Sequence, residues 1–314
     1  MKKCVVGVDT SNYTTSLAIV DEDLRLVASI KYPLTVKEGE RGLRQSDALF
    51  AHTKNLPLAF EQLKKIVAEE DLSIVAFGVS SRPRNQEGSY MPCFLAGVSA
   101  TTAASASVGV PLYEWSHQCG HIMAALYGSN SMDLLDGEFG AFHVSGGTTE
   151  LVKARLIEQG FSAEIVGGSK DLHAGQAIDR IGVAMGLGFP AGPALEELAR
   201  EYRGAIPSKK PSCEGCYVHL SGLENLALGL YQKTQDKSLV AAFVLDYVCK
   251  SLESMAEFFL KTYGDMPLVF GGGVMSNTII REKLVKRYSA RIAEPVYSAD
   301  NAIGIAVLTA RKVF

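Results

Sequence analysis

The sequence predicts an α/β protein made of two similar lobes that face a cleft. Residues 4–32 alternate short apolar runs with polar turns, as three consecutive strands would. Residues 139–166 repeat this arrangement, and helical segments follow both copies. A repeat of this kind indicates an internal duplication. The 314 residues, 47% of them hydrophobic, are enough for two domains with sizeable cores.

The first lobe is expected to open with strands and to close with a helix. Apolar side chains recur at helical spacing in residues 46–70, and residues 92–108 are rich in small residues, which indicates a closely packed helix. The expected strands are 4–9, 14–20, 24–32, 74–80 and 111–114, and the expected helices are 46–70, 92–108 and 115–127. The polar stretch 128–137 marks a boundary, which gives lobes of residues 1–130 and 131–314.

The second lobe is expected to follow the same plan, with an added segment at 171–235 that is mainly helical. The expected strands are 139–144, 150–156, 163–166 and 267–270, and the expected helices are 171–186, 194–202, 238–263 and one from residue 278. A final helix at about 299–314 could pack back on the first lobe.

Composition narrows the class of protein. The net charge of −3 argues against a uniformly basic, nucleic-acid-binding surface but leaves a local basic patch open. No apolar run approaches the roughly 18 residues that a membrane span needs. The N-terminal residues lead into a strand without a signal-peptide pattern, and the six cysteines show no disulfide spacing. We therefore expect reduced cysteines and a cytoplasmic protein without membrane contact.

Two histidines, His117 and His121, lie four residues apart in a stretch with helical character. On a helix this spacing puts both imidazoles on one face, where they could hold a metal such as zinc or iron. Histidines so spaced also cap helices, pack or face water, so the pair alone leaves both readings open. A zinc protease of the His-Glu-x-x-His type is disfavoured, because Gln118 occupies the position of its glutamate.

Three turns are candidates for binding an anion. Residues 9–11 could present backbone N–H groups and hydroxyls to a phosphate, although a plain β-hairpin would look the same. The glycines of residues 145–147 allow backbone amides to approach an anion closely. Residues 271–277 join a strand to a helix through three glycines, which is a nucleotide-site geometry without the Walker A or Gly-x-Gly-x-x-Gly pattern.

Two further motifs leave alternatives open. The polar loop 81–88 carries Arg82 and Arg84, which could meet phosphate or RNA or could simply be solvated. Cys213 and Cys216 form a Cys-x-x-Cys pair, which is half of a zinc ribbon without a second half. An ordinary loop is favoured there over a redox or metal role.

Eight short blocks, in this order along the chain, resemble those of one family. They are Gly7-Val8-Asp9-Thr10-Ser11, His117-x-x-x-His121, Val144-Ser145-Gly146-Gly147, Gly175-x-x-x-Asp179, Gly188-Phe189-Pro190-Ala191-Gly192-Pro193, Leu220-Ser221-Gly222-Leu223, Gly272-Gly273-Val274-x-x-Asn277 and Asp300-Asn301. Together they resemble the tRNA threonylcarbamoyladenosine transferase family, formerly described as glycoproteases. The resemblance spans essentially the whole chain. It implies the duplicated actin-like (ribonuclease H-like) ATPase fold of actin, sugar kinases and heat-shock ATPases, with two lobes around a nucleotide cleft.

The resemblance also implies roles for the matching residues. It implies one divalent metal, iron or zinc, whose ligands are His117, His121 and Asp300. This metal would bridge to a nucleotide phosphate. Asp300 could instead cap the final helix. The implied nucleotide is ATP, ADP, AMP or an acyl-adenylate. Its expected contacts are the first glycine turn (Ser145, Gly146, Gly147, Thr148), the second glycine turn (Gly272, Gly273) and three residues at the adenosine (Asp179, Gly192, Asn277). Asp9, Thr10 and Ser11 are a further candidate phosphate turn.

Several positions depart from the family's pattern. The family's opening turn usually reads Glu-Thr-Ser-Cys-Asp-Glu-Thr, and here Tyr13 replaces the acidic residue proposed as a base. The family's Ser-Gly-Gly-His-Thr has Thr148 in place of its histidine, and its Gly-Pro-Gly loop is replaced by residues 81–85. These changes indicate a divergent paralogue that keeps metal and nucleotide binding but has a rebuilt acceptor side. No catalytic residue is assigned.

The function implied by the resemblance is transfer of a threonylcarbamoyl group from threonylcarbamoyl-adenylate to the amine of an adenosine in tRNA. Two alternatives are a paralogue that carries out carbamoyl-type transfer to another acceptor and a non-catalytic nucleotide-binding partner. The implied partners are tRNA or another acceptor and other proteins of the same modification pathway, with a homo- or heterodimer also open.

Overall fold

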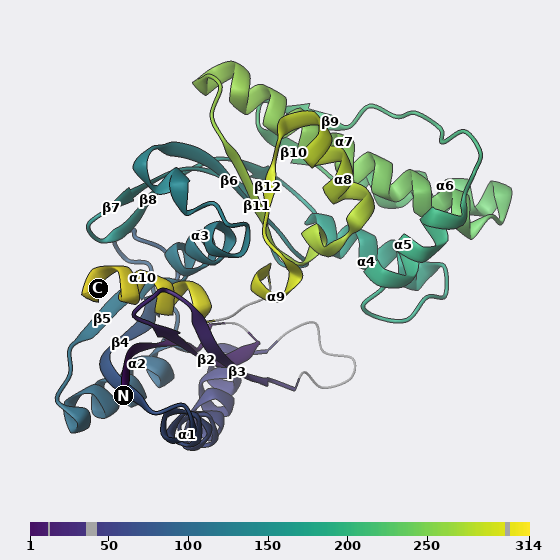
Figure 1. Cartoon of the computed structure of the whole chain (residues 1–314). Coiled ribbons are helices and arrows are strands. Elements are labelled where there is room, and N and C mark those ends of the chain that lie inside the picture. Colours follow the sequence, from purple (N-terminus) through teal and green to yellow (C-terminus); the bar gives the residue numbers. More distant parts are fainter. Residues whose placement is uncertain (12, 36–42, 299–301) are drawn as a thin grey trace. The chain divides into compact units, whose positions relative to one another are not determined.

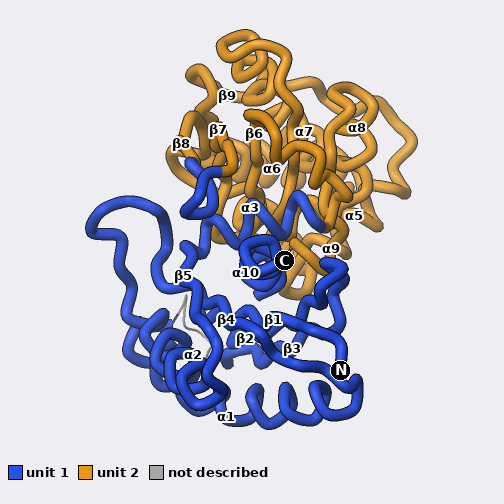
Figure 2. The backbone as a smooth tube through the Cα atoms, turned by 60° about the vertical axis from the view of Figure 1, so that its left-hand side comes forward, with its two compact units in different colours: residues 1–127, 157–162, 299–314 blue, residues 128–156, 163–298 orange. Residues whose placement is uncertain are grey.

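The chain divides into two compact units, shown in different colours in Figure 2. The computed structural model describes residues 1–11, 13–35, 43–298 and 302–314. Unit 1 comprises residues 1–127, 157–162 and 299–314, and unit 2 comprises residues 128–156 and 163–298. The expected lobes of 1–130 and 131–314 allow a C-terminal helix to pack back on the first lobe, and residues 299–314 do group with unit 1; the bounds differ at residues 128–130 and 157–162.

Unit 1 is built on a five-stranded sheet in the order β3-β2-β1-β4-β5 (Figure 1). Its strands are β1 (Lys2–Asp9), β2 (Thr14–Asp21), β3 (Leu26–Pro33), β4 (Leu72–Arg82) and β5 (Leu112–Ser116). The first three form an antiparallel meander, while β4 pairs parallel with both β1 and β5. The carboxyl ends of β1, β4 and β5 therefore lie at the same edge of the sheet.

Helices cover both faces of this sheet. They are α1 (Gln45–Glu69), α2 (Phe94–Val108) and α10 (Ile303–Val313), and α3 (His117–Gly128) packs on α10. Alternate strand residues such as Val6 and Ile19 join Leu56 and Leu63 of α1 in one apolar core. Helix α10 packs against β1, β2 and β4 from the other face.

Unit 2 is built on a seven-stranded sheet in the order β12-β11-β6-β7-β8-β10-β9. Its strands are β6 (Glu138–Val144), β7 (Thr149–Ile157), β8 (Gly160–Ser169), β9 (Ser212–Glu214), β10 (Tyr217–His219), β11 (Leu268–Gly271) and β12 (Arg291–Ile292). The run β8-β7-β6-β11-β12 has the same order as β3-β2-β1-β4-β5, so the predicted internal duplication is confirmed.

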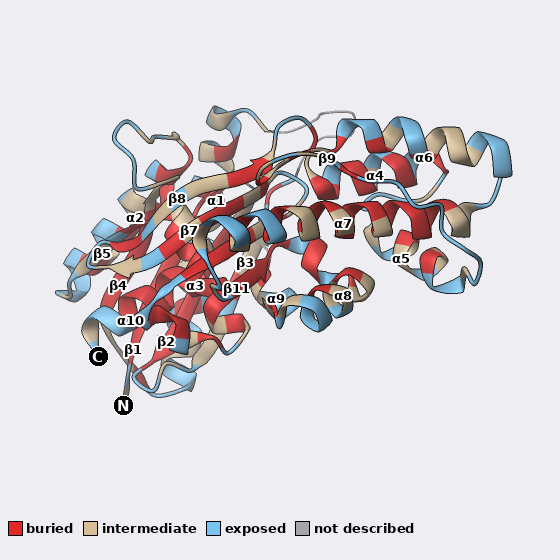
Figure 3. Cartoon of the chain, turned by 90° about the horizontal axis from the view of Figure 1, so that it is seen from above, coloured by how far each residue is buried: buried red, intermediate tan, exposed pale blue. Residues whose placement is uncertain are grey.

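The helices of unit 2 are arranged around one long, largely buried helix, α7 (Lys237–Tyr263; Figure 3). The others are η1 (Met132–Asp136), α4 (Ala174–Ala184), α5 (Gly192–Glu201), α6 (Ser221–Thr234), η2 (Gly273–Ser276), α8 (Thr278–Tyr288) and α9 (Pro295–Ser298). Helices α5, α6 and α8 each pack on α7, whose apolar residues form the core of the unit. The stretch around Cys213 and Cys216, where an ordinary loop is favoured from the sequence, contains β9, because Cys213 pairs with Val218 across a short hairpin.

No helix within the described ranges is both long enough and apolar enough to cross a membrane.

The contact between α10 and α3 is unusually close. A Cβ atom added to Gly304 would lie 1.8 Å from the carbonyl oxygen of Gly120, and that oxygen belongs to a helix backbone that cannot move aside cheaply. Glycine at position 304 is therefore required by this helix–helix approach.

We expect Gly304→Ala to destabilise unit 1 by about 3 kcal/mol, because the added methyl group overpacks a helix backbone. Trp115, the one tryptophan of the chain, donates from Nε1 to Thr309 of α10, so its fluorescence during urea unfolding reports on this contact. The matched control is Gly229→Ala in α6, because a Cβ atom added there meets no atom within 4 Å in the described chain. Alanine at this helix position should stabilise the folded protein by at most about 1 kcal/mol. Equal midpoints for the Gly304 variant and the wild type would contradict this account.

Candidate functional site

The two predicted histidines lie at the start of α3. Strand β5 runs directly into this helix, and the Ser116 hydroxyl accepts a hydrogen bond from the backbone N–H of Cys119 at 3.3 Å, as an N-cap residue does. The helix therefore begins at His117, and His121 follows one turn later. The centroids of their two rings are 4.1 Å apart, with the ring planes at 69°.

Asp9, at the end of β1, holds the first of these histidines in place. Its Oδ2 lies 3.2 Å from Nδ1 of His117, and the carboxylate is fully buried. It also accepts hydrogen bonds from the Ser11 backbone N–H at 3.2 Å, from the Ser11 hydroxyl at 2.8 Å and from the Ser80 hydroxyl on β4. Burial alone would raise the pKa of Asp9, but the electrostatic attraction and hydrogen bond of His117, with the hydroxyls of Ser80 and Ser11, hold that pKa below its usual range.

The donor set fits a metal site of the histidine type. In such sites a carboxylate commonly accepts from one ring nitrogen of a ligating histidine, which fixes the ring and its tautomer for coordination through the other nitrogen. Asp9 and His117 have this relationship. The third predicted ligand, Asp300, lies outside the described residues, and within them no group of three or more histidine, cysteine, aspartate or glutamate side chains is arranged to hold a metal.

The hydroxyls of the candidate phosphate turn are engaged inside unit 1. Thr10 donates to the carbonyl oxygen of Cys93 at 3.1 Å and accepts from the N–H of Gly97 at 3.2 Å, while the Ser11 hydroxyl donates to Asp9. Tyr13 follows this turn and is 45% exposed. The position at which the family pattern has an acid therefore presents a phenol to the surface of the unit.

The glycine turn after β6 is closed by its own atoms and by α4. The backbone N–H of Ser145 donates to the carbonyl of Thr148 at 2.7 Å, and the N–H of Thr148 donates to the Ser145 hydroxyl at 3.1 Å. Gly175 of α4 lies directly against the turn, since a Cβ there would be 2.7 Å from the nitrogen of Gly146. A Cβ on Gly146 or Gly147 would meet no atom within 4 Å in the described chain, so the outer side of the turn is open.

The second glycine turn lies beside the first. Strands β6 and β11 are parallel neighbours, so the turns after their carboxyl ends meet at one edge of the sheet. Gly272 has φ +97°, and a Cβ there would lie 2.3 Å from the carbonyl oxygen of Val144, so only glycine suits this position. Gly273 opens η2, and a Cβ on it would meet nothing within 4 Å of the described residues.

The three residues predicted at the adenosine are linked to one another within unit 2. Asp179 of α4 accepts from the backbone N–H of Ala191 at 2.8 Å, which fixes the loop that leads to Gly192 and α5. Glu196 of α5 in turn accepts from the N–H of Thr278 at 3.0 Å, at the start of α8. Asn277 caps α8 by accepting from the N–H of Ile280 at 3.0 Å. Their roles toward a nucleotide stay predictions.

The comparisons with known proteins decide the family. A family model described as tRNA N6-adenosine threonylcarbamoyltransferase matches residues 29–307. The chain belongs to this family. The predicted resemblance and the predicted class of enzyme, a transferase, are thereby confirmed.

Curated members of the threonylcarbamoyltransferase family match most of the chain. The protein of Streptococcus suis strain 05ZYH33 is 30% identical over 298 residues, which cover 90% of this chain and 83% of that protein. The proteins of Thermotoga neapolitana and Thermus thermophilus are 27% and 29% identical and cover 96% and 98% of this chain, and 92% of each of those proteins. All three are named tRNA N6-adenosine threonylcarbamoyltransferase.

Solved structures show the fold of this family member. Component A of (R)-2-hydroxyglutaryl-CoA dehydratase from Acidaminococcus fermentans is similar with a TM-score of 0.56 at 14% identity, over 98% of both chains. A ROK-family glucokinase from Streptomyces griseus, solved with glucose and AMPPNP, has a TM-score of 0.50 at 15% identity and covers 97% of this chain and 98% of its own. The predicted actin-like ATPase fold is confirmed.

The loop 81–88 and the Cys213–Cys216 pair are the two motifs whose roles the sequence leaves open. The Arg82 guanidinium donates to the Ser81 hydroxyl at 3.0 Å and to Asn85 at 2.9 Å within its own loop. Burial raises the pKa of the Cys216 thiol to about 11 and also raises that of Cys213, so both are protonated thiols at neutral pH and neither is activated as a nucleophile.

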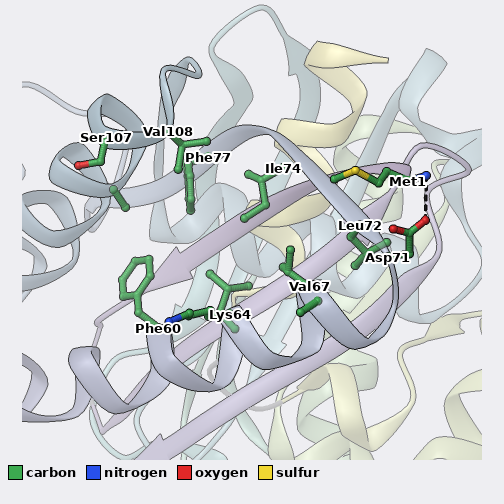
Figure 4. Close-up of a pocket in the computed structure, with 13 residues that line it drawn as sticks. Met1, Phe60, Lys64, Val67, Asp71, Leu72, Ile74, Phe77, Ser107 and Val108 are labelled. Carbon is green, nitrogen blue, oxygen red and sulfur yellow. Dashed lines mark ion pairs between the residues drawn. The ribbon is translucent and has the colours of Figure 1, made fainter.

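An apolar pocket of about 520 Å³ lies elsewhere in unit 1, between α1, α2 and β4 (Figure 4). Its lining includes Phe60, Ile74 and Val108 together with Asp71, which pairs with the terminal amine of Met1 at 2.9 Å. None of the predicted site residues lines this pocket, so it is separate from the candidate site.

Sequence reasoning missed Asp171, which anchors the segment leading into α4. Its Oδ1 accepts from the backbone N–H groups of Leu172 at 2.6 Å and Leu220 at 2.7 Å, and its Oδ2 accepts from the Ser221 hydroxyl at 2.6 Å. Burial alone would raise the pKa of Asp171, but the Ser221 hydroxyl and these N–H donors lower it to about 2. In the sequence, an aspartate shortly before a helix suggests only a local helix cap. The fold is needed to show that Asp171 contacts Leu220 and Ser221, which are 49 and 50 positions further along the chain.

We expect the Asp171 carboxylate to make stability depend on pH below about 4. Its pKa in the folded state, about 2, is below the roughly 3.9 of an unfolded aspartate, so its contribution is present above pH 4 and is lost as the pH falls towards 2. Because Asp171 is exposed, solvent screens this interaction, and we expect its contribution to be about 1 kcal/mol. Urea unfolding followed by far-ultraviolet circular dichroism should show that Asp171→Asn lowers stability at pH 7 and that its difference from the wild type shrinks towards pH 2. A difference that stays constant across this range would refute the assignment.

Proposed function

We propose that this chain transfers a threonylcarbamoyl group from threonylcarbamoyl-adenylate to the N6 amine of an adenosine in tRNA. Family membership supports the class of reaction. The observation that carries the proposal is the pair formed by the buried Asp9 carboxylate and the half-buried His117 ring. Buried ion pairs contribute little net stability, because desolvation offsets their attraction. This pair does, however, orient an imidazole as a metal ligand requires.

In this proposal unit 1 supplies the metal ligands. His117 and His121 would hold one divalent metal, iron or zinc, with Asp300 as the third ligand, and Asp9 would keep the His117 ring in its coordinating orientation. When bound, such a metal would neutralise charge on the phosphate of the adenylate and favour its departure.

Unit 2 would supply the contacts to the nucleotide, whether ATP, ADP, AMP or the adenylate itself. The Ser145–Thr148 turn is closed on its inner side and open outward at Gly146 and Gly147, so the backbone amides there are suited to phosphate oxygens. The adenosine and its ribose would contact Asp179, Gly192 and Asn277. These three residues are held near one another by the hydrogen bonds of Ala191 with Asp179 and of Thr278 with Glu196.

The transfer step would proceed as follows. The adenosine N6 attacks the carbamoyl carbon, a C–N bond forms, the bond between that carbon and the phosphate oxygen breaks, and AMP leaves. The proton lost by the amine passes to the departing phosphate or to water. Tyr13 places a phenol in the turn where the family pattern has a carboxylate, so the proposal gives it no part as a base.

A second candidate keeps the same donor and changes the acceptor. The observation in its favour is the exposed phenol of Tyr13 together with Thr148, since both replace titratable residues of the family pattern. An acceptor other than tRNA would then receive the carbamoyl-type group.

We expect His117→Ala to abolish binding of one equivalent of Zn²⁺ or Fe²⁺. Asp9→Asn should weaken it roughly 10- to 100-fold, because the ring of His117 loses the carboxylate that orients it. Titration calorimetry with each metal alone measures both effects. His219→Ala is the matched control, because His219 faces carboxylates of unit 2 and should leave metal affinity unchanged. Undiminished metal binding by His117→Ala would overturn the assignment.

We expect the protein to label tRNA when it is given radiolabelled threonine, bicarbonate, ATP, an enzyme that makes threonylcarbamoyl-adenylate and tRNA transcribed in vitro. The transcript is unmodified, so the acceptor adenosine is available. His117→Ala should reduce labelling to background. If the protein binds AMP but does not label tRNA, the second candidate, transfer to another acceptor, is favoured. If it neither binds AMP nor labels tRNA, the proposed function is refuted.

A further inference from the structure

Ser80, near the end of β4, is a fully buried serine whose side chain contacts a charge. Its hydroxyl donates to Oδ1 of Asp9, and within the described residues this hydroxyl has no other partner. A buried carboxylate that has lost its water needs such donors, or it loses its charge. The contact therefore joins the carboxylate of β1 to the neighbouring strand.

The sheet of unit 1 places Ser80 between the two groups of the Asp9–His117 pair. Strand β4 lies between β1 and β5 in the strand order. Asp9 and Ser80 directly follow the last pair of the β1–β4 register, and on its other side Ser80 pairs with Trp115, two residues before His117. Because neighbouring strands are about 4.8 Å apart, the carboxylate of Asp9 meets the His117 ring across the end of β4, where Ser80 lies.

The donors around the Asp9 carboxylate fall into two kinds. Ser11 supplies two of them, its backbone N–H to Oδ1 at 3.2 Å and its hydroxyl to Oδ2 at 2.8 Å. Since Ser11 belongs to the turn that Asp9 opens, these two donors orient the carboxylate only relative to that turn. Ser80 at Oδ1 and Nδ1 of His117, 3.2 Å from Oδ2, come from other elements. Among the described residues, Ser80 is thus the donor that orients Asp9 relative to the rest of the sheet.

We propose that Ser80 is a positioning residue for the metal site: its hydroxyl holds Oδ1 of Asp9, so that Oδ2 faces the His117 ring. The ring is then kept with Nδ1 towards Asp9 and with its other nitrogen available to a metal. This inference rests on the proposed function, because it requires that His117 binds a metal. Ser80 acts through Asp9 alone, so its effect should disappear when the Asp9 carboxylate is removed.

Titration calorimetry of the full chain with Zn²⁺ alone tests this role. Ser80→Ala should weaken Zn²⁺ binding by roughly 2- to 10-fold, the range expected for one net hydrogen bond. Ser251→Ala is the matched control and should bind Zn²⁺ as the wild type does. Ser251 is also a buried serine, but its hydroxyl donates at 2.8 Å to the carbonyl oxygen of Tyr247 in unit 2.

A second pair of variants separates the hydroxyl from the packing around it. Ser80→Thr and Ser80→Val have nearly the same shape, and both suit a strand, but only threonine keeps the hydroxyl. Ser80→Thr should bind Zn²⁺ within about twofold of the wild type, and Ser80→Val should bind it as weakly as Ser80→Ala. This pair also serves if the alanine variant does not fold. Equal affinities of the threonine and valine variants would overturn the role of the hydroxyl.

The combination with Asp9→Ala separates positioning from a general structural effect. If Ser80 acts through Asp9, the double variant should bind Zn²⁺ no more weakly than Asp9→Ala alone, whereas independent effects would multiply. Multiplied losses, or a Ser80→Ala variant with wild-type affinity, would overturn the role of Ser80 and leave the metal site intact. Wild-type protein that binds no Zn²⁺ would overturn the metal site of the proposed function, and this inference with it.

Discussion

The burial of the Asp9 carboxylate is the constraint on which the arrangement of unit 1 depends. A carboxylate removed from water must be paired and hydrogen-bonded, or it loses its charge. Asp9 meets this requirement with groups from three places in the chain: Ser11 beside it, Ser80 on β4 and His117 at the start of α3. The end of β1, the neighbouring parallel strand and the first turn of α3 therefore form one rigid polar cluster, and the position of the histidine pair follows from it.

The local features of this site could be predicted from the sequence. The spacing of His117 and His121 predicts a shared helix face, and the structure has both on α3. The glycine turns after β6 and β11 are recognisable because each follows a short apolar run, and the repeated meander predicts two sheets of the same order. Patterns of this kind depend on neighbours within a few residues, which a single sequence displays directly.

The pairing of Asp9 with His117 could not be predicted in the same way. The two residues are 108 positions apart in the sequence. In addition, an aspartate followed by threonine and serine in a turn is equally typical of a phosphate-binding turn. Only the parallel pairing of β1 with β4, and of β4 with β5, brings the end of β1 near the start of α3. The same reason applies to Asp171 and Ser221, which meet because the strands β8 and β10 are paired.

The place of α10 in unit 1 bears on how the chain is made. Residues 303–313 cover a face of the first sheet that presents Gly7 and Gly78 for close packing, yet they are synthesised after all of unit 2. At ordinary translation rates, the roughly 175 residues between the end of α3 and α10 take about 10–35 seconds to add. During that interval the sheet of unit 1 has one apolar side uncovered while unit 2 emerges and collapses. The apolar face that α10 finally covers therefore stays open to other apolar surfaces until the last helix has been made.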